Sequence, residues 1–366
     1  MKLLVTTSST ALPLYNSSSS ASPLLLHSKS EHHHHHSNLS MATCVENCAT
    51  TACRDGNNNN RYPCFYKPNK SFARNFQIQT QSPTLNRIDG AAAAAAASDL
   101  WAKMREEAIL DAEQEPILSC YYYTSILSHK SLESALANHL AVKLSNSSLP
   151  IGTLFDVFFA VLEQGPDLGR AVRADLRAVK ERDPACISYV HCFLGFKGFL
   201  AIQAHRVAHE LWRRQRKALA LVIQNRVSEV FGVDIHPGAR VGSGVLLDHA
   251  TGVVIGETAE VGDDVSILHG VTLGGTGKAG GDRHPKIGDG VLIGAGTCVL
   301  GSVRVGAGAK IGAGSVVLKE VPARTTAVGN PARLIGGKEN PVKLDRMPSF
   351  TMDHTSHIAE WSDYVI

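Results

Sequence analysis

Residues 287–318 read IGDGVLIGAGTCVLGSVRVGAGAKIGAGSVVL, and every sixth residue of this stretch is Ile or Val. The same six-residue period starts earlier at Ile235, slips by two residues between Leu247 and Ile255, and stops for the thirteen residues 274–286. Glycine directly follows eight of the thirteen aliphatic positions, which are Ile235, Val241, Leu247, Ile255, Val261, Ile267, Leu273, Ile287, Ile293, Val299, Val305, Ile311 and Val317.

A period of six matches neither an amphipathic helix nor a strand with alternate residues exposed. It is typical of a β-helix, in which each short strand points one aliphatic side chain inward and small residues let the chain turn a corner. Three such hexads complete one triangular coil. The thirteen hexads therefore predict a little over four coils, about 20 Å tall at a strand spacing of about 4.8 Å.

The residues before the repeat are expected to be helical. Apolar residues recur at helical spacing in six to eight segments, and strand signals are almost absent. Ser98 or Asp99 is expected to cap the first helix and Ser131 the second. The predicted fold class is therefore α+β, with an N-terminal all-helical domain (98–232), a left-handed parallel β-helix of hexapeptide repeats (233–336) and a flexible C-terminal tail (337–366).

The first part of the chain, residues 1–97, has the composition of a transit peptide followed by a linker. Its first forty residues hold eleven Ser, three Thr and a single acid, Glu31. Such Ser-rich, acid-poor segments direct proteins to the chloroplast or the mitochondrion. A second start at Met41 would give a shorter, cytosolic form. The seven alanines at 91–97 are expected to be part of the linker.

Composition excludes several classes of function. A net charge of +3 in 366 residues is too small to indicate nucleic acid or an anionic membrane as partner. No apolar run reaches the length of a membrane-spanning helix. The eight cysteines follow no disulfide framework, and those before residue 65 are too loosely spaced for a zinc site. We therefore expect a reducing compartment and no bound metal.

Polar residues interrupt the repeat where its period slips. His249 follows Asp248 at the slip, and Asp234 precedes His249 by fifteen residues. Because one coil takes eighteen residues, Asp234 and His249 are expected on neighbouring coils. A carboxylate that holds one imidazole nitrogen leaves the other free to take a proton, as the activation of a hydroxyl group requires. We therefore predict that His249 is a general base oriented by Asp234.

The interruption at 274–286 is predicted to be a functional loop, because a loop of this length rarely leaves a compact prism without a role. Five of its residues are glycines, which let the backbone approach a ligand closely. Arg283 is suited to bidentate hydrogen bonding with a carboxylate, and His284 is suited to a further hydrogen bond. Asp183 and Asp248 are suited to an ammonium group. A free amino acid would then be bound at both ends while its hydroxyl faces the general base.

The segments that depart from the repeat carry a resemblance. They are Asp234-Ile-His-Pro, Leu247-Asp-His-Ala-Thr-Gly, Val271-Thr-Leu-Gly-Gly-Thr-Gly-Lys, Gly281-Asp-Arg-His-Pro-Lys, and the run from Ile311 through Gly-Ala-Gly-Ser-Val-Val. Together they resemble serine O-acetyltransferase of the plant organellar type, in the hexapeptide-repeat acyltransferase family. The resemblance covers roughly residues 98–340 and so includes the helical part.

This resemblance implies transfer of acetyl from acetyl-CoA to the hydroxyl of L-serine, which gives O-acetyl-L-serine for cysteine biosynthesis. It assigns the same roles to His249 and Asp234, and it places the carboxylate of Asp183 in the amino-acid site. L-cysteine is implied as a competing feedback inhibitor. Acetyl-CoA is a co-substrate and no cofactor is bound permanently. The transfer is direct, and Cys298 is expected to pack rather than to act as a nucleophile.

The resemblance further implies contacts with acetyl-CoA and with partners. Gly275, Thr276, Ala295 and Ala313 would line a groove between subunits, and Lys310 would meet a phosphate. The assembly would be a homohexamer, a dimer of trimers. The final residues Tyr364, Val365 and Ile366 would enter the active site of O-acetylserine sulfhydrylase, which forms the cysteine synthase complex.

Two alternatives remain open. A γ-type carbonic anhydrase uses a similar solenoid with a zinc ion held by three histidines, and His249, His269 and His284 form a superficial trio. That function has no use for Asp248 or for the loop arginine. A non-catalytic scaffold that regulates the sulfhydrylase through its tail is the second alternative. Sugar acetyltransferases share the fold alone.

Overall fold

The computed structural model describes the backbone of residues 90–277 and 280–356, and side chains from residue 100 onward. These residues belong to one compact unit, Lys67–Ile366. The expected transit peptide, the cysteines before residue 65 and the terminal residues Tyr364–Ile366 lie outside the described residues. None of the described helices is long and apolar enough to cross a membrane.

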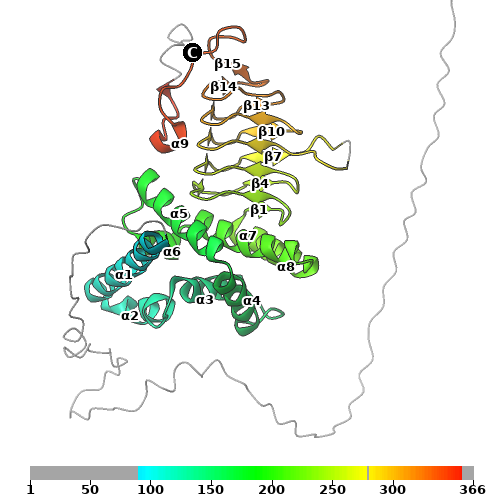
Figure 1. The fold of residues 1–366 in the computed structure, drawn as a ribbon. Helices are drawn as coiled ribbons and strands as arrows, with labels where there is room; N and C mark the ends of the chain where they lie inside the picture. Colours follow the sequence, from blue (N-terminus) through cyan, green and yellow to red (C-terminus); the bar gives the residue numbers. More distant parts are fainter. Residues whose placement is uncertain (1–89, 278–279, 357–366) are drawn as a thin grey trace, which may run out of the picture. The chain divides into compact units, whose positions relative to one another are not determined.

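A helical bundle precedes the strands (Figure 1). Its elements are α1 (Gly90–Gln114), η3 (Pro116–Leu118), α2 (Ser119–Tyr122), η4 (Tyr123–Leu127), α3 (Leu132–Leu144), α4 (Ile151–Gln164), α5 (Pro166–Arg182), α6 (Tyr189–Gly195), α7 (Lys197–Arg213) and α8 (Lys217–Phe231). The Ser131 hydroxyl accepts the Ser134 amide at 3.2 Å, so the predicted cap of α3 is confirmed. The alanine run predicted as a linker is instead helical, because α1 already begins at Gly90.

The bundle core is formed by large apolar side chains from several helices. Phe158 of α4, Phe193 of α6 and Phe199 of α7 are fully buried, together with Leu136 and Leu140 of α3. Burial of a side chain of this size stabilises the fold by about 1.5–3 kcal/mol. Within α3 the buried residues Leu132, Leu136, Leu140 and Leu144 recur four residues apart, and spacing of this kind is why the sequence pattern predicted the helices.

The repeat forms a prism of three parallel sheets, as predicted. Its strands are β1 (Asp234–Ile235), β2 (Arg240–Val241), β3 (Leu246–Leu247), β4 (Val254–Ile255), β5 (Glu260–Val261), β6 (Ser266–Ile267), β7 (Thr272–Gly274), β8 (Lys286–Ile287), β9 (Leu292–Ile293), β10 (Cys298–Leu300), β11 (Arg304–Val305), β12 (Lys310–Ile311), β13 (Val316–Val317), β14 (Thr326–Val328) and β15 (Arg333–Leu334). We name the sheets by their first strands. The β1 sheet has the order β1-β4-β7-β10-β13, the β2 sheet β2-β5-β8-β11, and the β3 sheet β3-β6-β9-β12-β14-β15.

Successive coils stack in register, so Ile235 lies against Ile255 and Ile255 against Leu273. Twelve of the thirteen periodic aliphatic residues are buried, and Val241 is partly exposed. The predicted left-handed β-helix is therefore confirmed, and its core is a stack of inward aliphatic side chains.

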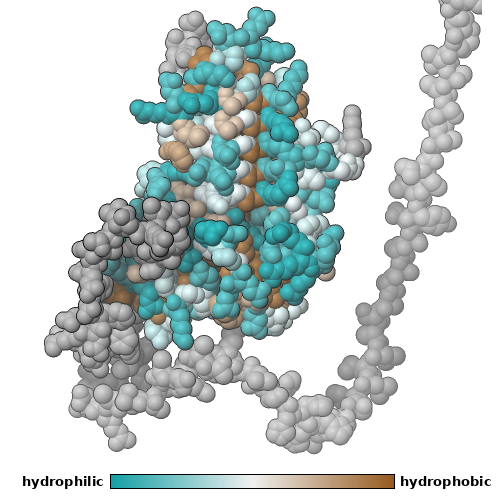
Figure 2. All heavy atoms as spheres, viewed as in Figure 1, coloured by the Kyte–Doolittle hydropathy of each residue, from teal (hydrophilic) through white to brown (hydrophobic). Residues whose placement is uncertain are grey.

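The outward residues differ among the three faces. The β2 sheet carries charges, with Arg240, Glu260, Lys286 and Arg304 in one register column. The β3 sheet is covered, since its outward residues Leu246, Ser266, Leu292 and Lys310 are all buried. The β1 sheet presents small, mostly uncharged residues, namely Val254, Thr272, Cys298 and Val316. Figure 2 shows a hydrophobic column up this face, on which Val254 is 38% exposed.

Both ends of the prism are closed, as expected for open strand edges. Helices α7 and α8 contact β3 and β1 at one end. At the other end the chain reverses after β14, and β15 pairs antiparallel to it. A buried ion pair, Arg206 with Asp175 at 2.8 Å, joins α7 to α5. The same carboxylate accepts the Val245 amide at 2.9 Å, which fixes the bundle to the first coil.

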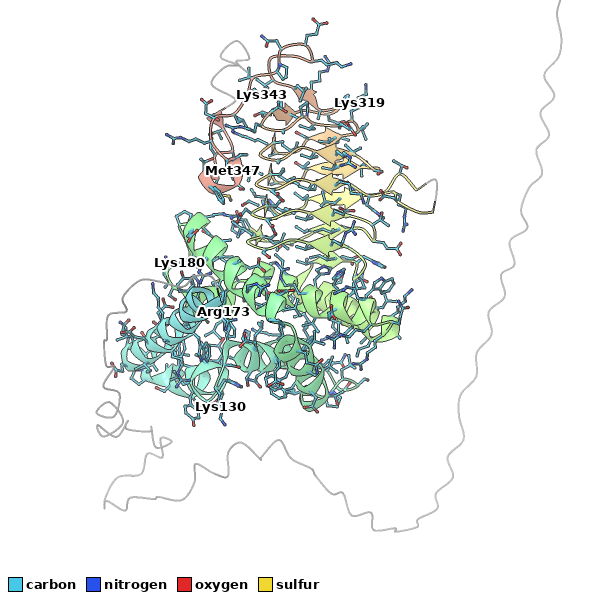
Figure 3. The ribbon with its side chains drawn as sticks, viewed as in Figure 1. Lys130, Arg173, Lys180, Lys319, Lys343 and Met347 are labelled. Carbon is cyan, nitrogen blue, oxygen red and sulfur yellow. The ribbon has the colours of Figure 1, made fainter. Side chains whose placement is uncertain are left out.

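The described part of the C-terminal tail packs against the prism rather than extending freely. Residues 344–356, with the short helix α9 (Pro348–Thr351), lie along the β3 sheet (Figure 1). Ser266 donates its hydroxyl to the Ser349 carbonyl at 3.2 Å. Met347, labelled in Figure 3, fills the space beside Gly290. This part of the tail is therefore held against the prism, and residues 357–366 lie outside the described residues.

Candidate functional site

The predicted site residues divide between two edges of the β1 sheet. Each strand of this sheet is preceded by a turn on one side of the sheet and followed by a turn on the other side. We call these turns the N-terminal edge and the C-terminal edge, after the ends of the strands. The two edges hold different chemistry.

The N-terminal edge holds His249 in the turn between β3 and β4. Both His249 (φ 54°) and Ala250 (φ 58°) have left-handed backbone conformations, which are rare for residues other than glycine. Two such residues in succession store strain, and strain of this kind concentrates at functional sites. The two-residue slip in the repeat is therefore a strained turn that lifts the His249 side chain out of the prism.

The His249 imidazole is accessible. Its side chain is 76% exposed, and its Nε2 lies 3.8 Å from Asp248 Oδ1. The ring of His269, one coil above, lies edge-on at a centroid distance of 5.9 Å. An exposed imidazole beside a carboxylate can reach a substrate and exchange a proton with it.

Asp234 lies on the outer face of β1, next to this turn. Its amide donates to the Val253 carbonyl at 2.9 Å, and its Oδ1 accepts from Gln224 Nε2 at 2.6 Å. The predicted hydrogen bond between Asp234 and His249 is not formed within the described part of the chain. The predicted neighbouring-coil placement is correct, because β1 pairs directly with β4.

The C-terminal edge holds His284, which is only 6% exposed. Thr258 donates its amide to His284 Nδ1 at 3.2 Å, and the Thr258 hydroxyl lies 2.8 Å from the same nitrogen. Because Nδ1 is an acceptor, the proton of the neutral ring is on Nε2. Burial, and then the Arg283 charge, lower the pKa of His284, so the ring stays neutral. His284 is therefore a fixed hydrogen-bond donor.

Arg283 is held beside this histidine. Its amide donates to the Thr258 hydroxyl at 3.1 Å, and its guanidinium forms an ion pair of 2.8 Å with Glu257. The hydrogen bond from Arg283 lowers the pKa of Glu257. The Gly275 backbone packs against both Arg283 and His284. Nη1 of Arg283 also donates to the Gly281 carbonyl at 3.3 Å, and the N–H groups that the bonds to Glu257 and Gly281 leave unused can bind a carboxylate.

Glu257 and Thr258 were not predicted from the sequence as site residues. They stand at a corner where the repeat has mostly glycine and small residues, so their polarity was the available signal. Gln224 was also missed. It lies on a helix, and nothing in its local pattern distinguishes it from a solvent-exposed glutamine.

The residues predicted to contact acetyl-CoA follow the same division. Gly275 and Thr276 lie at the C-terminal edge, where Thr276 contacts Gly301. Ala295 and Ala313 lie at the N-terminal edge, stacked in the same column of turns as His269. Both alanines are partly or fully exposed.

Lys310 and Asp183 lie apart from these edges. Lys310 is 2% exposed, and its ammonium is covered by Asp353 Oδ2 at 3.6 Å and by the Ser356 hydroxyl at 3.2 Å. The structure therefore does not present Lys310 to a phosphate. Asp183 ends α5, and its Oδ1 accepts the Ala185 amide at 2.8 Å.

Comparisons with known proteins identify the family. A model of the N-terminal region of serine acetyltransferase matches residues 100–204, and the bacterial transferase hexapeptide model (six repeats) matches residues 284–319. The chain is 64% identical over 332 residues to chloroplastic serine acetyltransferase 1 of Arabidopsis thaliana, covering 89% of this chain and 100% of that protein. It is 60% identical over 339 residues to mitochondrial serine acetyltransferase 3 of the same plant, covering 89% and 86%.

Solved structures agree. Soybean serine acetyltransferase complexed with serine is 62% identical, with a TM-score of 0.63, and covers 64% of this chain and 97% of its own. A serine acetyltransferase in complex with cysteine is 44% identical, with a TM-score of 0.67, and covers 74% of this chain and 100% of its own. The repeat, the helical bundle and these matches agree, and the chain belongs to the serine acetyltransferase family.

Proposed function

We propose that the chain transfers the acetyl group of acetyl-CoA to the hydroxyl of L-serine, with His249 as general base. His249 takes the hydroxyl proton while the serine oxygen attacks the thioester carbonyl. The tetrahedral oxyanion then collapses, the carbon–sulfur bond breaks, and the CoA sulfur receives the proton from His249. A base of this kind contributes about 10²–10⁴-fold to the rate.

The observation that carries this proposal is the pair of edges flanking an uncovered sheet. An exposed imidazole on a strained turn lies at one edge, and an arginine with a buried, neutral histidine lies at the other. Their roles are complementary: the first moves a proton and the second binds a carboxylate.

The complete site is proposed to form between two copies of the chain. In a single chain the β1 sheet separates the two edges. The β2 sheet carries a column of charged residues and the β3 sheet is covered by the C-terminal tail, whereas the β1 sheet has neither. Its hydrophobic column favours contact with other copies of the chain. Packing three copies about an axis parallel to the prism would bring the N-terminal edge of one chain to the C-terminal edge of the next.

In this composite site, Arg283 and His284 would bind the serine carboxylate. Asp248 lies beside His249 with its side chain 20% exposed, and it would bind the ammonium group. Asp183 is proposed to assist Asp248 in binding the ammonium group. For this, the Asp183 carboxylate must release the Ala185 amide and bind the substrate instead. The orienting role of Asp234 toward His249 likewise remains a proposal.

Acetyl-CoA would lie in the groove between the copies, along Gly275 and Thr276 of one chain and Ala295 and Ala313 of the other. Lys310 is left out, because the tail covers its ammonium group. L-cysteine is proposed to compete for the serine site, since it has the same carboxylate and ammonium groups. A cysteine complex of a family member supports this assignment.

Assembly, partner and location are also proposed. Exposed apolar residues of the bundle, including Ile117 and Tyr123, favour pairing of trimers into a homohexamer. The terminal residues Tyr364, Val365 and Ile366 are proposed to bind O-acetylserine sulfhydrylase, so their deletion should abolish co-purification while acetyl transfer continues. Relatives named chloroplastic and mitochondrial support an organellar address. A cytosolic form starting at Met41 remains part of the proposal.

The test is thiol release from acetyl-CoA in the presence of L-serine. His249→Ala should lower kcat by about 10²-fold or more. His191→Ala is the control, because this exposed histidine lies on α6 of the helical bundle and has no assigned role, and it should keep the parent rate. An unchanged rate in His249→Ala would favour the scaffold alternative. Adding L-cysteine should raise the apparent KM for serine.

A further inference from the structure

Helix α8 reaches the proposed catalytic pair through one side chain. Gln224 Nε2 donates to Asp234 Oδ1 at 2.6 Å. Gln224 lies in the middle of α8, seven residues before its last residue Phe231, and its side chain is partly buried. No other described hydrogen bond or ion pair involves the Asp234 carboxylate, so Oδ2 is left open.

The helix and the His249 turn are held to each other by the backbone. Gly232 ends α8 with φ 67°, and its carbonyl accepts the Gly252 amide at 2.8 Å. Asp234 follows two residues later, and its own amide is bonded to Val253. These backbone hydrogen bonds fix the positions of helix α8, the His249 turn and the Asp234 backbone relative to one another. Only rotation of the Asp234 side chain remains free, and the amide of Gln224 restricts it.

We infer that Gln224 is a positioning residue of the acetyl transfer reaction: it binds one oxygen of Asp234 and thereby directs the other toward the imidazole of His249. This rests on the roles proposed above for Asp234 and His249. Second-layer hydrogen bonds of this type orient the groups that touch the substrate.

The chemistry of an amide suits this task. An arginine or lysine at this place would neutralise Asp234 and weaken its stabilisation of the imidazolium that forms during proton transfer. A glutamate would repel the carboxylate. A glutamine donates a hydrogen bond and adds no net charge, so Asp234 keeps its charge for His249.

The test substitutes Gln224→Met, which removes the donor but keeps the side-chain length and the helix propensity. We expect kcat to fall about tenfold, as is typical for the loss of an orienting hydrogen bond. The KM for serine and for acetyl-CoA should change little, because Gln224 touches neither. Asn225→Met is the matched control, since Asn225 is the exposed neighbour on the same helix and its side chain makes no hydrogen bond in the described residues.

A double-mutant cycle separates positioning from a general effect on folding. In the Asp234→Ala background, Gln224→Met should have no further effect on kcat. An equal tenfold loss in that background, or no loss in the parent, would overturn the inference. These outcomes are distinct from failure of the proposed function, which would appear as full activity of His249→Ala. Melting temperatures of all variants show whether the fold is intact.

Discussion

The two edges of the β1 sheet hold their histidines in opposite ways. His249 is 76% exposed on a strained turn, and its nearest carboxylate is 3.8 Å away. His284 is 6% exposed, and Thr258 holds its Nδ1 from two sides. A proton-transfer group must reach the substrate and change its charge, whereas a binding group is most effective when it is fixed and keeps one charge state. The difference indicates that the N-terminal edge, with His249, is the reactive edge and that the C-terminal edge, with His284, is the binding edge.

The sharpest way to break this comparison is to mix two inactive variants. His249→Ala removes the reactive edge and Arg283→Ala the binding edge, and each alone should lose about 10²-fold in serine turnover. If each site combines edges from two chains, co-refolded mixtures should regain about a quarter of the parent rate, because one neighbouring pair in four has both edges intact. A mixture no more active than its components would show that both edges act within one chain.

Gly256→Ala should have the next largest effect, and only on binding. The added Cβ would overlap the imidazole of His284 and push the ring out of its position. Loss of its hydrogen bond to the serine carboxylate should raise the KM for serine about 10–100-fold, while kcat stays near the parent value. Gly280→Ala in the nearby loop is the control, since nothing lies within 4 Å of its added Cβ. A main effect on kcat would contradict the division into edges.

Thr258→Val should weaken binding less, because it removes one hydroxyl and keeps the backbone amide that donates to His284. The hydroxyl makes two neutral hydrogen bonds, one with His284 Nδ1 and one from the Arg283 amide, and the loss of both predicts a rise of about 5–30-fold in the serine KM and in the inhibition constant of cysteine. Thr258→Ser restores the hydroxyl and should restore both constants. Steady-state kinetics with cysteine as a competitor measures both constants. If the Thr258→Ser variant does not restore them, packing of the threonine methyl group is the cause instead.

The smallest expected effect is that of pH on serine binding. Burial lowers the pKa of His284, so the folded protein keeps this ring neutral at pH values where a free imidazole, with its ordinary value near 6.5, begins to protonate. Protonation would leave the Nε2 donor in place but would add a proton to Nδ1, which faces the Thr258 amide, and would so disturb the position of the ring. The ring therefore keeps its binding position between pH 8 and pH 7. The serine KM should change by less than about twofold over this interval and rise only at lower pH. A rise that begins above pH 7 would show that the ring is not held neutral.

Much of the reactive edge could be predicted from the chain alone. The slip between Leu247 and Ile255 placed His249 at a break in the repeat. The fifteen-residue spacing predicted that Asp234 lies on the adjacent coil, which the pairing of β1 with β4 confirms. The binding edge was predicted only in part. Arg283 and His284 were found because they stand in a loop, but Glu257 and Thr258 act from the coil below it, across about 25 residues of sequence.

The sequence by itself determined the prism, its register and the polar breaks in it, because a period of six residues is compatible with few folds and each aliphatic residue must point inward. Only the tertiary structure decided how helices and tail meet this prism. The contact of Gln224 with Asp234, the covering of Lys310 by Asp353 and the packing of the tail on the β3 sheet depend on side chains from separate elements. Local spacing holds no information about such pairs, since they form only when whole elements pack together.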